Sequence, residues 1–141
     1  MKPVILVVED EPAILELLEV NLEDAKKIVA AGVKYYIEVS NMPTTNEALY
    51  FLMEKGLIVA PSKAVNAGGV AVSGLEMSQN SERLAWAAEE VDAKLHTIME
   101  NIHAASAKAA EECGLGYNLV AGANIAGFKK VADAMMAQGI V

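Results

Sequence analysis

Cysteine and aromatic side chains are scarce in this sequence, and each scarcity restricts what the protein can be. One cysteine, Cys113, stands among the 141 residues, so no disulfide can form within the chain. Such cysteine usage fits a reducing compartment, and we expect a cytoplasmic protein in which Cys113 is an ordinary thiol. Aromatic residues make up 5% against 54% hydrophobic residues, so we expect a core of aliphatic side chains and methionine.

Positive charge is too sparse for a nucleic-acid partner. Lysine and arginine total 11 against 19 acidic residues, the net charge is −8, and basic residues never cluster beyond a pair. Nor is there an apolar stretch of the roughly 20 residues that span a bilayer, so no membrane partner is expected. The apolar run Met1–Val8 ends in acidic residues without a small-residue cleavage site, and we interpret it as a strand.

The length and the alternation of apolar patterns predict one α/β domain. Short runs rich in β-branched residues and tyrosine predict three strands, at Val4–Val8, Lys34–Ser40 and Leu57–Ala60. Helical patterns separate them, which favours parallel pairing in a three-layer β-α-β-α-β unit, a Rossmann- or flavodoxin-like half, followed by three C-terminal helices. The strand order could be 1-2-3 or 2-1-3, and we favour 1-2-3.

Apolar spacing and stop residues predict where the helices lie. One uninterrupted helix should start at Pro12 and end before Gly32, because a single apolar stripe is sustained through Ile14, Leu18, Leu22, Ala25 and Val29. A capping box formed by Thr44 and Glu47 should start a second helix that ends at Lys55. Pro61–Gly69 is expected to be a loop. The C-terminal helices are expected at about Val70–Trp86, Glu89–Glu112 and Ala123–Gln138.

Two stretches carry resemblances to known families. Residues Pro3 to about Asp24, through VILVVEDEPAILELLEVNLED, resemble the first strand and helix of a response-regulator receiver domain. From about Ala25 to Val141 the chain resembles the C-terminal part of an NADP-type glutamate dehydrogenase, through GVKYYIEVSNMPTTNEAL, VAPSKAVNAGGVAVSGLEMSQNSERL, VDAKLHTIM and GANIAGFKKVADAMMAQG. The two meet inside one expected helix, between about Leu22 and Lys26. A junction that keeps helical register favours an engineered chimera forming a single domain over 1–141, in which residues 1–24 are receiver-like and residues 25–141 are dehydrogenase-like.

The dehydrogenase resemblance implies a vestigial cofactor site. Asn41 in SNMPTT and Asn66 in NAGG match residues beside the nicotinamide end of NADP, and Ser73 in VAVSGLEM matches a serine that touches the substrate's side-chain carboxylate. Each could instead be structural, the asparagines as turn residues and the serine as a small helix-packing residue. The loop before Gly69 could also present free N–H groups of a helix start to an anion.

Other parts of the expected chemistry are missing from the sequence. No G-x-G-x-x-G motif joins the first strand to its helix, and Gly122–Gly127 follows no strand, so it is expected to allow close helix packing. The resemblance places the catalytic Lys and Asp of the dehydrogenases in a domain outside this sequence. We therefore expect no turnover and, at most, weak binding of NADP.

The receiver resemblance implies a weak, vestigial metal site at Glu9 and Asp10, where carboxylates would hold Mg²⁺. The phosphoacceptor Asp and the conserved Lys of that family have no counterpart, so helix capping is the alternative role. His96 and His103 lie about 10 Å apart along a helix, too far for one metal ion, and we interpret them as a polar face.

Three functional hypotheses follow. The first is an engineered chimera without enzymatic activity, which forms a homodimer to cover the apolar surface of its last helices and its bare sheet edge. The second is a module with residual affinity for NADP(H). The third is an oxidoreductase of the glutamate dehydrogenase type.

Overall fold

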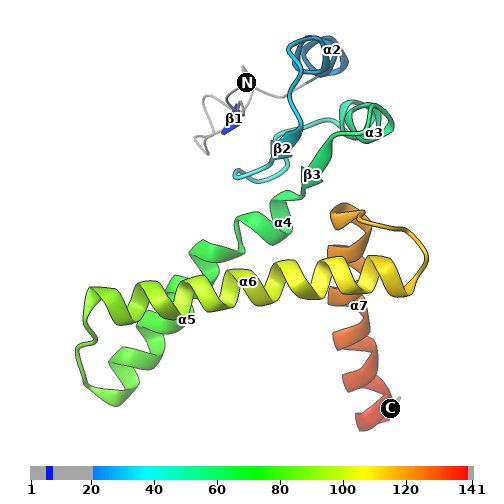
Figure 1. Cartoon of the computed structure of the whole chain (residues 1–141). Helices are drawn as coiled ribbons and strands as arrows, with labels where there is room; N and C mark the ends of the chain where they lie inside the picture. Colours follow the sequence, from blue (N-terminus) through cyan, green and yellow to red (C-terminus); the bar gives the residue numbers. More distant parts are fainter. Residues whose placement is uncertain (1–5, 8–20, 140–141) are drawn as a thin grey trace.

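The computed structural model describes residues 6–7 and 21–139 and shows a mixed α/β fold dominated by helices (Figure 1). The elements are β1 (Leu6–Val7), α2 (Leu22–Ala30), β2 (Tyr35–Ile37), α3 (Asn46–Glu54), β3 (Ile58–Ala60), α4 (Ser62–Val65), α5 (Ala67–Glu82), α6 (Ala88–Glu112) and α7 (Leu119–Gln138). The predicted α/β class is therefore confirmed. No helix among the described residues is both long enough and apolar enough to cross a membrane.

The sheet is short and parallel. β2 pairs with β3 so that Tyr36 aligns with Val59 and Ile37 with Ala60. On the other side of β2, the two residues of β1 align with Tyr36 and Ile37, which gives the order β1-β2-β3. β2 is shorter than the predicted strand Lys34–Ser40: it ends at Ile37, and the N–H of Glu38 makes one further bond to the Ala60 carbonyl at 3.0 Å.

The core lies between the β2–β3 pair and helices α2 and α3, which lie side by side (Figure 1). Its buried members each come from one of these elements: Ala25, Tyr36, Ala48, Leu52 and Val59. Tyr36 is the largest of the fully buried side chains. Val120 of α7 packs against the same cluster, so the C-terminal helix is anchored to the sheet by apolar contact.

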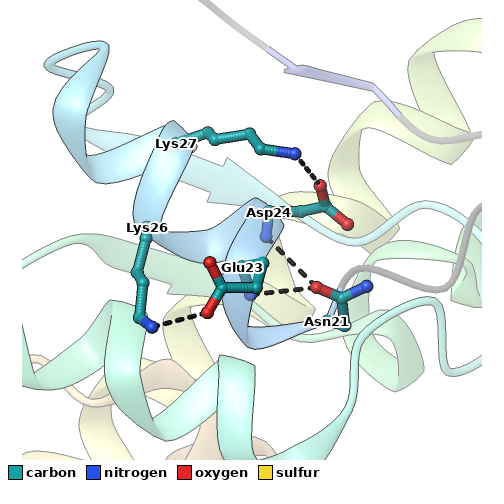
Figure 2. A network of polar contacts seen from close by, with 5 residues as sticks. All are labelled: Asn21, Glu23, Asp24, Lys26 and Lys27. Atoms are coloured by element: carbon teal, nitrogen blue, oxygen red, sulfur yellow. Dashed lines mark hydrogen bonds and ion pairs between the residues drawn. The ribbon is translucent and has the colours of Figure 1, made fainter.

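The predicted uninterrupted helix over 14–29 is wrong at Asn21. Asn21 has an extended backbone (φ −92°, ψ 178°), and its side-chain oxygen accepts hydrogen bonds from the N–H groups of Glu23 (2.9 Å) and Asp24 (3.2 Å). Figure 2 shows this N-cap with two adjacent ion pairs, Lys26–Glu23 and Lys27–Asp24. An asparagine that satisfies two free N–H groups starts a helix, so the apolar stripe alone was misleading. The rest of that prediction falls on residues outside the described ranges.

The stops of α2 and α3 were predicted correctly, whereas the start of α3 was misplaced by a residue and the predicted helix Val70–Trp86 is α5, which ends earlier, at Glu82. Gly32 (φ +74°) and Gly56 (φ +81°) end α2 and α3 with left-handed backbones, which glycine adopts without strain. Thr45, and not Thr44, is the N-cap of α3, and its hydroxyl accepts from the Ala48 N–H at 3.3 Å. Thr44 does not cap the helix because its hydroxyl bonds to Tyr36.

The predicted loop over 61–69 is wrong, because this segment is almost entirely helical. Asn66 has right-handed helical geometry (φ −75°, ψ −5°) and joins α4 to α5. The N–H of Gly69 donates to the Asn66 carbonyl at 3.1 Å, so the anion site expected before Gly69 is absent. Packing explains why the glycines do not end the helix: a Cβ at Gly68 would lie 3.4 Å from the Met99 sulfur of α6.

Helix α6 crosses both α5 and α7 (Figure 1). α7 begins at Leu119, earlier than the predicted Ala123, because the side chain of Asn118 accepts from the Ala121 N–H at 3.0 Å. Gly122 is buried against α6, and a Cβ there would lie 1.9 Å from the Ser106 carbonyl oxygen. The expectation that this glycine-containing segment permits close packing is confirmed at Gly122.

The α6–α7 contact predicts opposite effects for two glycine substitutions in one helix. Gly122→Ala should lower the free energy of unfolding by about 3 kcal/mol, because the methyl group meets backbone that cannot yield. Gly127→Ala is the matched control: no atom lies within 4 Å of its Cβ position, so it should raise stability by up to about 1 kcal/mol. Urea unfolding followed by circular dichroism measures both. Equal effects would contradict the close approach.

Candidate functional site

A cavity of about 530 Å³ opens beyond the carboxyl end of β2 and β3. Its walls come from the segment after β2, the start of α3, the start of α4 and the first turns of α7, and include Glu38, Thr45, Ser62, Lys63 and Asn124. Ligands of parallel α/β proteins bind at this edge of the sheet. The cavity and the turns around it are therefore the candidate functional site.

Glu38 is the buried charged residue of this site. Its side chain is 5% exposed, and its Oε2 accepts a hydrogen bond of 3.0 Å from the backbone N–H of Ser62. Ser62 begins α4 directly after Pro61, which has no side-chain acceptor to cap the helix. The Glu38 carboxylate thus takes the place of a local N-cap and lies where the helix dipole favours negative charge.

Tyr36 and Thr44 form a second polar contact beneath the cavity. Their hydroxyl oxygens lie 2.7 Å apart and both side chains are buried. Burial raises the pKa of Tyr36 above its ordinary value, the negative charge of Glu38 adds to this rise, and the hydrogen bond from Thr44 opposes it. The phenol therefore stays protonated at neutral pH and holds the turn after β2 to the strand.

Lys63 and Asn124 join α4 to α7 at the cavity wall. The Lys63 ammonium donates to the side-chain oxygen of Asn124. In the turn after β2, Ser40 is fully buried and its hydroxyl has no hydrogen-bond partner among the described residues. The turn that leads to Asn41 consequently carries one unmet polar group.

The structure places the predicted cofactor residues at one edge of the sheet. Asn41 is exposed in the bend after β2, and Asn66 is half-buried at the α4–α5 junction after β3. The Glu38–Ser62 hydrogen bond ties these two segments together. Neither asparagine lines the cavity, which lies next to both turns.

Ser73 lies further along α5 and is exposed. Its hydroxyl donates to the Gly69 carbonyl at 3.2 Å within the helix. Ser73 follows Asn66 by seven residues, about two helical turns, so both side chains share one face roughly 10 Å apart along the axis. α6 packs against the Gly68 side of α5, which leaves the Ser73 face open.

The other candidates do not form a site in the part of the chain that the structure describes. Glu9 and Asp10 lie outside the described residues, so the metal site stays a prediction. Within residues 6–7 and 21–139 no cluster of three acidic, histidine or cysteine side chains could hold a metal ion. His96 faces Glu100 at 3.3 Å and His103 faces the Tyr117 hydroxyl, in keeping with a polar helix face. Cys113 is an exposed free thiol.

Parallel strands, with polar turns and a cavity at their carboxyl edge, define a class of α/β proteins that bind ligands there. Residues 15–139 match the model of one such family, described as Glutamate/Leucine/Phenylalanine/Valine dehydrogenase. The chain belongs to this family.

Individual relatives agree with the family match. The chain is 76% identical over 123 residues to the NAD-specific glutamate dehydrogenase of Clostridium symbiosum, which covers 86% of this chain and 27% of that protein. It is 54% identical to the NADP-specific glutamate dehydrogenase of Escherichia coli (strain K12), over 87% of this chain and 27% of the relative. The chain thus spans about 27% of the length of these relatives.

Solved structures show the same fold. A glutamate dehydrogenase structure superimposes with a TM-score of 0.84 at 74% identity, covering 88% of this chain and 28% of that one. A hetero-hexameric glutamate dehydrogenase from Thermus thermophilus gives a TM-score of 0.80 at 25% identity, covering 97% and 30%. The fold is therefore that of the corresponding part of these enzymes.

These comparisons confirm the glutamate dehydrogenase resemblance. They also bear on two other predictions, the NADP type and the position of the junction. NAD-specific and NADP-specific relatives both match, so the NADP type is not distinguished. The family match begins at residue 15, before the junction predicted between Leu22 and Lys26. None of the relatives named above is a receiver domain, and the receiver-like start rests on its sequence pattern alone.

The buried Tyr36 phenol predicts a loss of stability at alkaline pH. Because its pKa is raised on folding, its contribution is complete below the ordinary value of 10.0 and is lost as the pH rises through the folded value. Tyr36→Phe should cost about 1 kcal/mol at neutral pH and should remove this alkaline loss. Exposed Tyr50 provides the control, Tyr50→Phe. Urea unfolding from about pH 8 to about pH 11 tests this, and an unchanged pH dependence in Tyr36→Phe would contradict it.

Proposed function

We propose that this chain supplies the nicotinamide-facing part of an oxidoreductase of the glutamate dehydrogenase type. The observation that carries the proposal is the position of Asn41 and Asn66 in turns at one edge of the sheet, beside the cavity, in a chain 76% identical to a glutamate dehydrogenase. The third functional hypothesis thus takes precedence over the first. NAD or NADP, when bound, would accept or donate the hydride.

The residues present fit one end of the cofactor. Asparagine side chains offer both a donor and an acceptor, as binding a nicotinamide carboxamide requires, and Asn41 is exposed for this purpose. Ser73, on the open face of α5, would meet the substrate carboxylate. The sequence contains no glycine-rich turn for the pyrophosphate, so we propose weak affinity and no turnover by these 141 residues alone.

We also retain two architectural proposals from the sequence. The first is a three-layer arrangement of three strands, supported by the alignment of Leu6 and Val7 with Tyr36 and Ile37. The second is a chimeric origin with receiver-like residues 1–24, supported by the sequence pattern alone. The break in helical geometry at Asn21 removes the argument that helical register runs unbroken across the junction.

Self-association is the third proposal, and the apolar face of α7 supports it. Phe128, Val131 and Met135 are 73%, 59% and 55% exposed, and their spacing of three and four residues places them on one stripe. Exposed apolar stripes of this kind mark protein interfaces. The Thermus thermophilus relative is described as hetero-hexameric, and for this chain we propose a homodimer.

Weak binding of a nicotinamide cofactor can be tested by titration calorimetry with NADH and with NADPH. We expect dissociation constants on the order of 1 mM, weakened about tenfold by Asn66→Ala because two hydrogen bonds are lost. Asn80→Ala, an exposed asparagine at the far end of α5, is the matched control and should bind as the wild type does. The absence of heat with both cofactors would reject the proposal. Cofactor oxidation in the presence of 2-oxoglutarate and ammonia would contradict the absence of turnover.

The apolar stripe on α7 predicts that one charged substitution separates the dimer. Val131→Glu should shift the sedimentation coefficient from dimer to monomer at micromolar concentration, because a carboxylate would be buried without a partner. Ala137→Glu adds the same charge on the opposite, exposed face of α7 and should leave the dimer intact. A wild-type protein that sediments as a monomer would exclude the homodimer.

A further inference from the structure

The side chain of Glu38 is buried, whereas carboxylate side chains are ordinarily exposed to solvent. It follows the last residue of β2 directly, is 5% exposed, and lines the cavity at the carboxyl edge of the sheet. Its carboxylate accepts a hydrogen bond from the N–H of Ser62, 24 residues further along the chain, while its own backbone N–H donates to the Ala60 carbonyl at 3.0 Å. A buried carboxylate is costly unless it is paired, so the contact with the start of α4 is what makes its burial tolerable.

The contact fixes α4, and through α4 it fixes Asn66. Pro61 offers no capping side chain, so the Ser62 N–H would otherwise lack an acceptor at the helix start. The first turn then closes when Ala64 and Val65 donate to the Pro61 carbonyl and Asn66 donates to the Ser62 carbonyl. Asn66 therefore stands one helical turn from the residue that Glu38 holds.

The same carboxylate stands close to Asn41 on the other side. Asn41 is three residues beyond Glu38, in the bend that the Tyr36–Thr44 hydrogen bond closes from below. Glu38 is thus the point at which the turn after β2 and the helix after β3 are bonded to each other. The backbone N–H of Glu38 bonds to Ala60 of β3, and the carboxylate of Glu38 bonds to Ser62 at the start of α4, so the side chain supplies the contact with the helix.

We propose that Glu38 is a positioning residue that sets Asn66 relative to Asn41 by holding the N-terminus of α4. This inference rests on the proposed function for its relevance to cofactor binding, while the positioning itself can be measured without a cofactor. In this proposal Glu38 acts through α4 and not by direct contact with the cofactor. Its removal loosens α4 and moves the Asn66 side chain away from the nicotinamide end.

Three variants of this chain separate positioning from general stability. Glu38→Ala removes the acceptor, and Glu38→Gln keeps an oxygen that can accept from Ser62 while removing the charge. Asn21→Ala is the matched control, because it removes the side-chain cap of helix α2, which does not line the cavity, and leaves Ser62 untouched. Thermal unfolding identifies any variant that fails to fold, in which case Glu38→Gln still carries the comparison.

Amide hydrogen exchange by NMR provides the measurement that needs no cofactor. Glu38→Ala should speed exchange at residues 62–66 about fivefold or more and shift the side-chain amide signals of Asn66, while α2 exchanges as in the wild type. Asn21→Ala should give the reverse pattern. Glu38→Gln should restore most of the protection. Unchanged exchange at residues 62–66 in Glu38→Ala would overturn the proposal.

Titration with NADH then tests the functional consequence. Glu38→Ala should bind about tenfold more weakly, Glu38→Gln within about threefold of the wild type, and Asn21→Ala no more than about threefold weaker. Equal weakening by Glu38→Ala and Asn21→Ala would also overturn the proposal. If the wild type binds no NADH while the exchange pattern is as expected, the proposed function fails and Glu38 still positions α4.

Discussion

The burial of Tyr36 is the constraint on which the rest of the fold depends. Its ring occupies the centre of a very short sheet, in contact with the residues that α2, α3 and β3 contribute to the core. A parallel pair of three-residue strands is too small to be stable alone. The sheet therefore depends on the side chains that pack it against the helices. The phenol also determines the polar structure above it, because it engages Thr44 and leaves Thr45 to start α3.

Local signals predicted much of this fold. The β-rich residues around Tyr36 and Val59 form strands, Gly32 and Gly56 end helices, and the long α6 has nearly its predicted bounds. These features depend on a few neighbouring residues, so the sequence contains the information. The glutamate dehydrogenase resemblance likewise rested on contiguous motifs, and the family match over residues 15–139 bears it out.

The errors arose where a distant contact overrides a local preference. Asn66, Gly68 and Gly69 have the composition of a loop, yet the chain is helical from Ala67 onward, and Gly68 packs closely against Met99 and Leu95 of α6. Asn21 lies within a regular apolar stripe, and its side chain nevertheless satisfies two N–H groups and starts a new helix. A pattern of apolar spacing contains no information about which polar residue will cap.

In the candidate site, too, the sequence predicted the features that depend on neighbouring residues and missed the one that depends on a distant contact. Asn41 and Asn66 were found because their motifs are contiguous, and both remain candidates awaiting measurement. Glu38 was missed because a charged residue in a strand pattern is ordinarily assigned to solvent. Its partner lies 24 residues away, so only the folded structure could reveal the bond. The one signal in the sequence was the acidic residue at the end of a strand that packs in the core.

The position of Asn66 at the N-cap of α5 has a consequence for how the chain can vary in length. Asn66 and Ser73 lie on about the same face of α5 because seven residues make nearly two helical turns. If one residue were inserted between them, Ser73 would rotate about 100° around the helix axis. A loop in this place would accommodate the same insertion by a change in its own conformation. Substitutions on the exposed face of this stretch keep the relative orientation of Asn66 and Ser73. An insertion or deletion of one residue changes it.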